Sequence, residues 1–159
     1  MIALRAQILT AEAFAPFGTV TEHPSLGDRF YMDTQLTNRR PIAAKASLSI
    51  AHYDARHERP LPLTVIERHE FSSQSFMPLS AGRYLTVVAP KNADGTANLV
   101  ALSAFVAESQ SITYKADVWH GPMTPLDGPM RFAIFMFNDG VSGDEEVIRH
   151  EQPFAMLMI

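Results

Sequence analysis

Two short segments of the sequence combine histidine with other groups that can bind a small polar molecule. VIERHEFSSQSF contains Glu67, His69 and Gln74, and TYKADVWHGPM contains the single tryptophan, Trp119, followed directly by His120. Glu67 and His69 are two residues apart, so in a strand the carboxylate and the imidazole lie on one face. Histidine titrates near neutral pH, and its neutral ring also binds metal ions. These residue types therefore indicate proton transfer or a metal site.

His69 and His120 each come where a predicted strand ends and a turn begins. In a barrel such positions lie near a mouth or line the interior, where small-molecule sites gather. The alternative for each is a histidine that only bonds to a carbonyl of its own loop. Trp119 can be a core residue or the wall of a pocket. The remaining histidines are expected to be surface residues: His23, His52, His57 and His150.

Short β-strands are predicted to position these residues. In KASLSIAHY, Leu48 and Ile50 alternate with serines, which is the period-2 pattern of a strand. PLTVIERH alternates in the same way and ends at His69. Further runs rich in β-branched and aromatic residues are SQSFMPL, RYLTVVAP, LSAFVA and RFAIFMF. Turn-forming clusters separate the runs, the longest at residues 92–98, so we expect an all-β antiparallel sandwich or small barrel.

Only one short helix is expected. Eleven prolines and eight glycines interrupt every candidate for a long helix. Near the N-terminus, Thr10 can cap a helix, Glu12 suits its first turn and Gly18 can end it. Phe14 and Phe17 would then share one face of that helix.

The composition indicates a folded protein and excludes several classes. The length predicts one domain, residues 1–159, and 47% hydrophobic with 19% charged residues is typical of a globular chain. Without cysteine, disulfides, thiolate metal ligands and cysteine nucleophiles are excluded. A net charge of −4 without a basic run argues against binding nucleic acid or anionic lipid. No segment resembles a signal peptide or a membrane span, so a soluble cytoplasmic protein is expected.

The two histidine segments together resemble the ureidoglycolate lyase family. ERH at residues 67–69, Gln74 and F-x-P-L at residues 76–79 match one stretch of that family, and the AF of LSAF, Tyr114 and VWH-x-P at residues 118–122 match another. The opening EAFAPFG, residues 12–18, matches the usual start. Order and spacing agree over nearly the whole chain. The resemblance implies a cupin-like antiparallel β-barrel, a double-stranded β-helix, with a short N-terminal helix.

The resemblance also bears on metal binding, because many cupins hold a metal ion with histidines and a carboxylate. His69 is similar to the histidine of the first cupin motif and His120 to that of the second, whereas Gln74 stands where the first motif has a glutamate. An amide oxygen binds a divalent cation more weakly than a carboxylate does. The resemblance therefore implies that no cofactor is required, with weak divalent metal binding at His69, Gln74 and His120.

The activity that the resemblance implies is the cleavage of ureidoglycolate to glyoxylate and urea in purine (allantoin) catabolism. A base must take the hydroxyl proton of the substrate, and an acid must protonate the leaving nitrogen. His120 is the expected base, with His69 or Glu67 as its partner. Lys115 would supply positive charge, although residue type alone favours a solvated strand lysine. Contacts to the substrate are expected from Gln74, Trp119 and Tyr114.

Several positions differ from the usual family pattern. The second histidine of the family's WHHPL is Gly121, the histidine that commonly follows the tyrosine is Lys115, and the usual Asp-Arg-Gly has Asp139 in place of the arginine. Ser103 stands where a basic residue is usual. These changes leave other functions open: a non-catalytic or regulatory cupin that binds a small organic acid, a cupin enzyme for a related hydroxy or keto acid, and a metal-dependent cupin isomerase or dioxygenase.

The expected partner is a small organic acid, with neither nucleic acid nor membrane. Members of the family usually form homodimers, so the resemblance implies a homodimer here. The apolar C-terminal FAMLMI, with Phe154, Leu157 and Ile159, fits that expectation because its exposure would leave an interaction patch. The same segment can instead pack against the body of its own chain.

Overall fold

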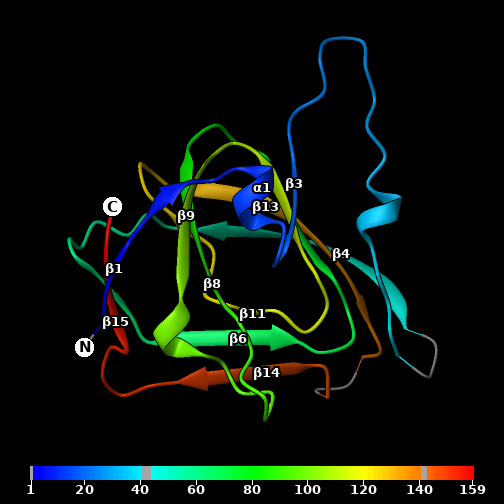
Figure 1. Ribbon diagram of the computed structural model, residues 1–159. Coiled ribbons are helices and arrows are strands. Elements are labelled where there is room, and N and C mark those ends of the chain that lie inside the picture. The colour runs from blue at the N-terminus through cyan, green and yellow to red at the C-terminus, as the bar shows by residue number, and fades with distance from the viewer. Residues whose placement is uncertain (1, 41–43, 141–142) are drawn as a thin grey trace.

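The computed structural model describes residues 2–40, 44–140 and 143–159, and β-strands make up most of its regular structure (Figure 1). The strands of this part of the chain are arranged in three sheets. The five-stranded sheet has the order β3 (Gly18–Thr21), β10 (Ser111–Tyr114), β7 (Gln74–Pro78), β13 (Met130–Asn138) and β4 (Lys45–Tyr53). The seven-stranded sheet has the order β14 (Glu145–Arg149), β6 (Val65–His69), β11 (Trp119–His120), β8 (Arg83–Ala89), β9 (Ser103–Glu108) and β2 (Gln7–Ile8), with β12 (Thr124–Pro125) beside β8. The three-stranded sheet has the order β1 (Ile2–Arg5), β15 (Ala155–Met158) and β5 (Leu61–Leu63).

The two larger sheets face each other and enclose one hydrophobic cluster. Its side chains come from both sheets, for example Tyr84 and Phe105 from one and Tyr114 and Phe132 from the other. Alternation along the strands turns these residues inward, as it does in small barrels. Most neighbouring strands run antiparallel, with parallel pairing at β1–β15 and β2–β9. The prediction of an all-β, cupin-like barrel is therefore confirmed.

The predicted N-terminal helix is present but shorter than its sequence signals suggest. Helix α1 spans Ala11–Phe14, and the Ala13 N–H donates to Thr10 Oγ1 at 3.2 Å, so Thr10 is the cap. The described residues also form two short 3₁₀ helices, η1 (Asp33–Gln35) and η2 (Leu99–Ala101). Gly18 opens β3, where an added Cβ would lie 2.1 Å from the carbonyl oxygen of Thr113. Only glycine permits this close approach of the two strands.

The C-terminal segment packs against its own chain. Strand β15 pairs with β1 and β5, and its Ala155 and Leu157 are 0% exposed. They join a second hydrophobic cluster that also contains Ile66 and Trp119. Met158 and Ile159 at the end of the segment remain 41% and 44% exposed. The buried part of the segment therefore does not argue for a dimer, because its side chains are covered by the chain itself.

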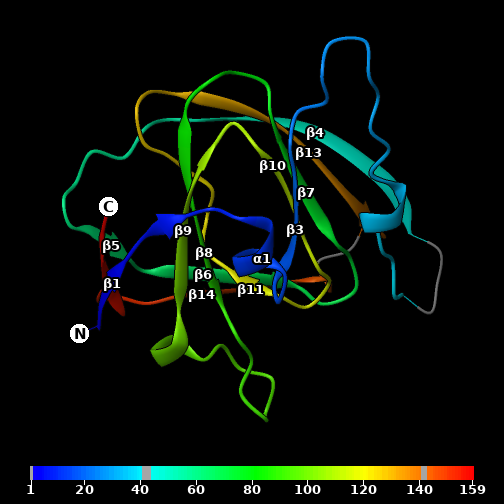
Figure 2. The same ribbon diagram turned by 45° about the horizontal axis from the view of Figure 1, so that its top comes forward.

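A long loop between β3 and η1 extends away from the barrel (Figures 1 and 2). Residues 22–31 of this loop are all exposed, and we call them the arm. The arm returns to the five-stranded sheet at η1.

None of the helices in the described ranges has the length and apolar character needed to cross a membrane.

Candidate active site

Strands β6 and β11 bring the two histidine segments together. The strands are neighbours, and His120 lies directly opposite Glu67 in their antiparallel register. His69 lies two residues further along β6, on the same face as Glu67. One ligand-type atom from each of these three side chains lies within 4.8 Å of the other two. We call Glu67, His69 and His120 the histidine–glutamate cluster.

The ring of His120 is held on two sides. Its Nδ1 lies 3.0 Å from the carbonyl oxygen of Val118, and its face stacks on Tyr114 with ring centroids 4.1 Å apart. Tyr114 is buried and shares a hydrogen bond of 2.5 Å with Thr86 Oγ1. Nδ1 of His120 therefore contacts the carbonyl of Val118, and Nε2 is left for the cluster. Tyr114 is expected from the family resemblance to contact the substrate; in the structure its contact with the cluster is the stacking on the ring of His120.

The contact with Val118 determines which nitrogen of His120 carries hydrogen. A carbonyl oxygen only accepts, so Nδ1 is the donor and Nε2 faces Glu67 Oε1 at 3.4 Å. A nitrogen lone pair and a carboxylate in this position repel each other unless a proton or a metal ion lies between them. Burial alone would raise the pKa of Glu67, but His120 and His69 outweigh it and bring the pKa below its ordinary value. Glu67 is therefore ionised at neutral pH, and its carboxylate faces Nε2 of His120.

His69 is a neutral imidazole inside the protein. Its side chain is 6% exposed, and neither ring nitrogen has a hydrogen-bond partner among the described residues. Burial lowers the pKa of His69, and His120 lowers it further, against the opposing effect of Glu67. The ring is thus uncharged at neutral pH, with one nitrogen able to accept a proton or bind a metal ion.

A cavity of about 400 Å³ opens beside His69, a volume suited to a small molecule. Gln74 lines the same cavity, and its Oε1 is buried without a hydrogen-bond partner in the described part of the chain. The rings of His69 and His120 have centroids 5.9 Å apart, so His69 connects the cavity with the rest of the cluster. The remaining lining residues are Ser49, Ile134, Met136, Asn138, Gly140, Asp144 and Glu145.

Sequence reasoning missed Arg40, a buried cation beside the cluster. Its guanidinium forms ion pairs with Asp144 at 2.6 Å and Asp139 at 3.1 Å, and its side chain is 2% exposed. It also donates to the carbonyl oxygen of Phe137 at 3.0 Å. Asp144 Oδ2 lies 4.0 Å from His69 Nδ1, so the acid that Arg40 holds faces the cluster. The family departure at Asp139 is therefore compensated by an ion pair with Arg40.

The structure does not bring Lys115 or Trp119 to the cluster. Lys115 is exposed, and its Nζ donates to the carbonyl oxygen of Ala15 at 2.6 Å. Trp119 precedes His120 in β11, so its side chain lies on the opposite face, where it is 0% exposed in the second hydrophobic cluster. Its Nε1 donates to the carbonyl oxygen of Gly95 at 3.0 Å. These positions do not support a substrate contact by either residue, and Trp119 is a core residue.

The departure at Gly121 leaves the histidine–glutamate cluster intact. An added Cβ at Gly121 would lie 3.4 Å from Val87 Cβ and 3.8 Å from the carbonyl oxygen of Val65. It would thus point into the apolar surroundings of the second cluster, on the side of β11 away from His120. A histidine at this position would not join Glu67 and His69.

The donor atoms of the cluster fit a divalent cation. Imidazole nitrogens with a carboxylate oxygen are a common set for zinc and similar ions. His120 Nε2, both nitrogens of His69 and Gln74 Oε1 are buried without hydrogen-bond partners among the described residues. Glu67 adds a carboxylate to the set of His69, Gln74 and His120 that the family resemblance implies.

The barrel and the cluster define a cupin-like protein with a small-molecule site built on two histidines and a carboxylate. The ureidoglycolate lyase family model matches residues 1–156, and the chain belongs to this family. The ureidoglycolate lyase of Mesorhizobium japonicum is 36% identical over 142 residues, which cover 84% of this chain and 85% of that protein. That of Pseudomonas entomophila is 34% identical over 163 residues, covering 96% and 95%.

A solved structure agrees with the fold. The dTDP sugar isomerase from Desulfovibrio desulfuricans superposes with a TM-score of 0.51 at 15% identity, over 87% of this chain and 85% of that chain. At this identity the likeness bears on the fold alone.

Proposed function

We propose that the protein is a lyase that cleaves ureidoglycolate to glyoxylate and urea, in purine (allantoin) catabolism in the cytoplasm. Its membership of the ureidoglycolate lyase family supports this reaction. The structural observation that carries the proposal is the histidine–glutamate cluster beside a cavity of about 400 Å³. A pocket that only bound an organic acid would not need two buried imidazoles with unpaired nitrogens.

The reaction needs one base and one acid. The substrate carries a hydroxyl group, a ureido nitrogen and a carboxylate on the same carbon. The base takes the hydroxyl proton, the oxygen forms a double bond to the carbon, and the carbon–nitrogen bond breaks with its electron pair on nitrogen. The acid protonates that nitrogen, so the products are glyoxylate and urea. One proton is removed and one is added, and no electrons are gained or lost.

The two histidines can share these proton transfers. We assign the base to His69, because its lowered pKa keeps the ring neutral and the cavity reaches it. We assign the acid to His120, because its Nε2 faces the carboxylate of Glu67 at 3.4 Å and its ring lies next to that of His69. This division reverses the one expected from the sequence, in which His120 is the base.

Neutral groups are the proposed contacts for the substrate. Gln74 Oε1 can accept a ureido N–H, and the amide nitrogen of Gln74 can donate to a substrate oxygen. Lys115 lies outside the site, and Arg40 is engaged by two aspartates. The substrate carboxylate therefore has the hydroxyl of Ser49 and the amide of Asn138 as donors in the cavity wall.

The proposal predicts that the purified protein releases glyoxylate and urea in equal amounts from racemic ureidoglycolate. The rate should be far above that of the uncatalysed reaction, and an enzyme specific for one enantiomer would stop at half of the substrate. Colorimetric measurement of both products tests this. Release at the background rate, with saturable calorimetric binding of ureidoglycolate or another hydroxy or keto acid, would contradict the lyase and indicate a binding protein.

We further propose that the reaction requires no cofactor and that the cluster binds a divalent cation weakly. Glu67, His69, Gln74 and His120 would hold such an ion, which would supply positive charge to substrate oxygens. Titration with Co²⁺, followed by visible absorption, should show one ion per chain. Glu67→Gln should weaken this binding by about 10-fold or more, since it removes a charged ligand.

Glu58→Gln is the matched control for this titration, because Glu58 is exposed and lies outside the cluster. An unchanged spectrum of the wild-type protein at millimolar Co²⁺ would contradict the metal site. Loss of lyase activity in a chelator, with recovery on adding a metal, would contradict the absence of a cofactor requirement.

We also propose a homodimer, as the family resemblance implies. Strand β4 is the last strand of the five-stranded sheet, and its Leu48 and Ile50 are 70% and 69% exposed. Neighbouring apolar side chains on an uncovered sheet face are typical of an interaction site. This face, rather than the C-terminal segment, supports the dimer.

A further inference from the structure

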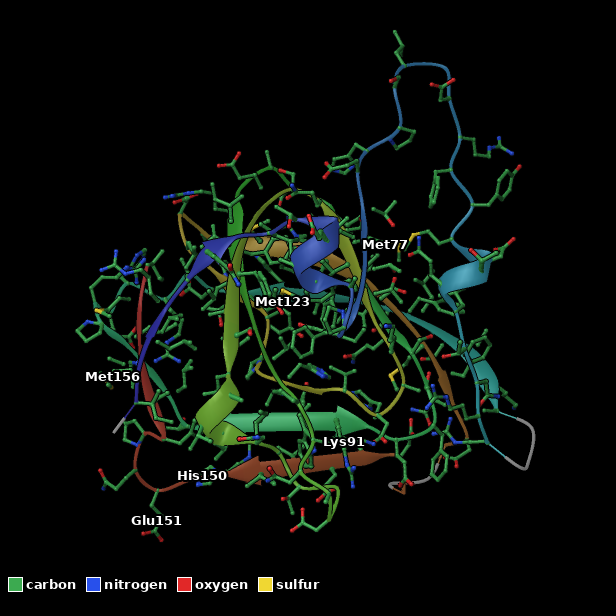
Figure 3. The ribbon with its side chains drawn as sticks, viewed as in Figure 1. Met77, Lys91, Met123, His150, Glu151 and Met156 are labelled. Atoms are coloured by element: carbon green, nitrogen blue, oxygen red, sulfur yellow. The ribbon has the colours of Figure 1, made fainter. Side chains whose placement is uncertain are left out.

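The arm presents apolar side chains to solvent. Leu26, Phe30 and Tyr31 are 106%, 53% and 64% exposed, and Figure 3 shows the side chains of the arm standing clear of the rest of the chain. Ordering a loop costs backbone conformational entropy at every residue. Burial of these side chains would offset that cost, but the chain's own barrel does not bury them.

The outer face of the five-stranded sheet lies at the foot of the arm and is also apolar. Ile134 and Met136 of β13 line the cavity, so by alternation the residues between and beside them point outward. A hollow of about 160 Å³ on this face is lined by Met32, Leu36, Ser75, Met77 and Phe135. Figure 3 shows Met77 of β7 beside the base of the arm. We call the following residues the outer apolar face: Leu48, Ile50, Met77, Ala133, Phe135 and Phe137.

We infer that the arm docks on the outer apolar face of a second copy of this chain, so that two copies exchange arms about a twofold axis. One chain supplies both an apolar arm that projects from its own barrel and an uncovered apolar face. In a twofold dimer each contact occurs twice, so the arm and the outer apolar face of each copy are both covered by the other copy. A hairpin-like arm of this length reaches roughly 15 Å, and packed sheets lie about 10 Å apart, so the arm can cross to the partner.

The composition and size of the two surfaces favour a second copy as the partner. Each chain carries a net charge of −4, which opposes self-association, but the six residues of the outer apolar face are uncharged, and the nearest charge on that side of β13 is the exposed Arg131 at its edge. The charged residues of the arm, Glu22, Asp28 and Arg29, have both signs and suit the rim of an interface. A stable interface takes roughly 800 Å² and about 20 residues from each partner, which the arm and the outer apolar face together approach.

This inference rests on the proposed homodimer and is independent of the lyase reaction. Sedimentation and cross-linking measure it without substrate, so a protein inactive on ureidoglycolate could still exchange arms. Conversely, an active lyase could sediment as a monomer. That result would overturn the exchange of arms and leave the lyase reaction standing.

The first test replaces the apolar side chains of the arm in the full-length protein. The triple variant Leu26→Ser, Phe30→Ser, Tyr31→Ser should raise the dimer dissociation constant by about 100-fold in sedimentation equilibrium, because buried aromatic side chains dominate interface energies. The control Ile8→Ser, Val100→Ser removes side chains that are 78% and 82% exposed on other elements, and it should not change the constant. A monomeric wild-type protein, or an equally tight dimer of the triple variant, would overturn the inference.

The second test uses the absence of cysteine in the chain. Phe30→Cys and Ile50→Cys variants carrying different tags are mixed and treated with a short bismaleimide. Exchange of arms should give a covalent dimer containing one chain of each kind. If a Phe30→Cys, Ile50→Cys double variant instead joins its two cysteines within one chain and no covalent dimer forms, the arm folds onto its own sheet and the inference fails.

Discussion

Replacement of His120 by alanine is expected to lower kcat/KM for ureidoglycolate by about 10²- to 10⁴-fold, the usual contribution of one acid or base group. His120 Nε2 lies 3.4 Å from Glu67 and is the proposed source of the proton for the leaving nitrogen. Alanine removes that proton and leaves Glu67 ionised next to an empty space. Initial rates of glyoxylate release over a range of substrate concentrations measure the change.

Two further variants separate chemistry from folding. His120→Gln keeps most of the side-chain volume that stacks on Tyr114 but cannot titrate, so it should be as inactive as the alanine variant while unfolding at nearly the wild-type temperature. His57→Ala changes an exposed histidine and should keep the wild-type rate. A folded His120→Ala protein with a rate within a few-fold of wild type would remove His120 from the mechanism.

Alternation along one strand was sufficient to predict part of the site. Because Glu67 and His69 are two residues apart in a strand, alternation places them on the same face of β6, and the structure confirms this. The same rule places Trp119 opposite to His120, so its core position could have been inferred from the sequence. Lys115 likewise follows the buried Tyr114 and faces out. The resemblance suggested roles for Lys115 and Trp119 that this local rule argues against.

Contacts between distant segments could not be predicted in this way. The pairing of His120 with Glu67 depends on the register of β11 against β6, which the closure of the whole barrel determines. Arg40 lies in an irregular segment without periodicity, and its ion pairs with Asp139 and Asp144 appear only when two segments about 100 residues apart in the sequence meet. The arm has the turn-like composition of any loop, and its projection from the barrel follows from how β3 and η1 are anchored.

Replacement of Arg40 by methionine is expected to lower the free energy of unfolding by about 3–5 kcal/mol, the usual cost of breaking a buried ion pair by removing one partner. The side chains of Arg40 and Asp144 are 2% and 5% exposed, so the variant would leave Asp144 charged without its cation. Urea unfolding at one fixed protein concentration measures the loss.

The matched control is Arg83→Met, which breaks the exposed ion pair of Arg83 with Asp127, whose side chains are 51% and 44% exposed. Exposed pairs contribute about 0–1 kcal/mol, so this variant should be nearly as stable as wild type. The double variant Arg40→Met, Asp144→Asn should recover part of the lost stability, since it removes the unpaired charge. If Arg40→Met alone is as stable as wild type, the ion pair does not hold Asp144 in place beside His69. If it is unstable as expected, the same arginine that compensates Asp139 also fixes the acid next to the proposed base, which links the stability of this region to the geometry of the site.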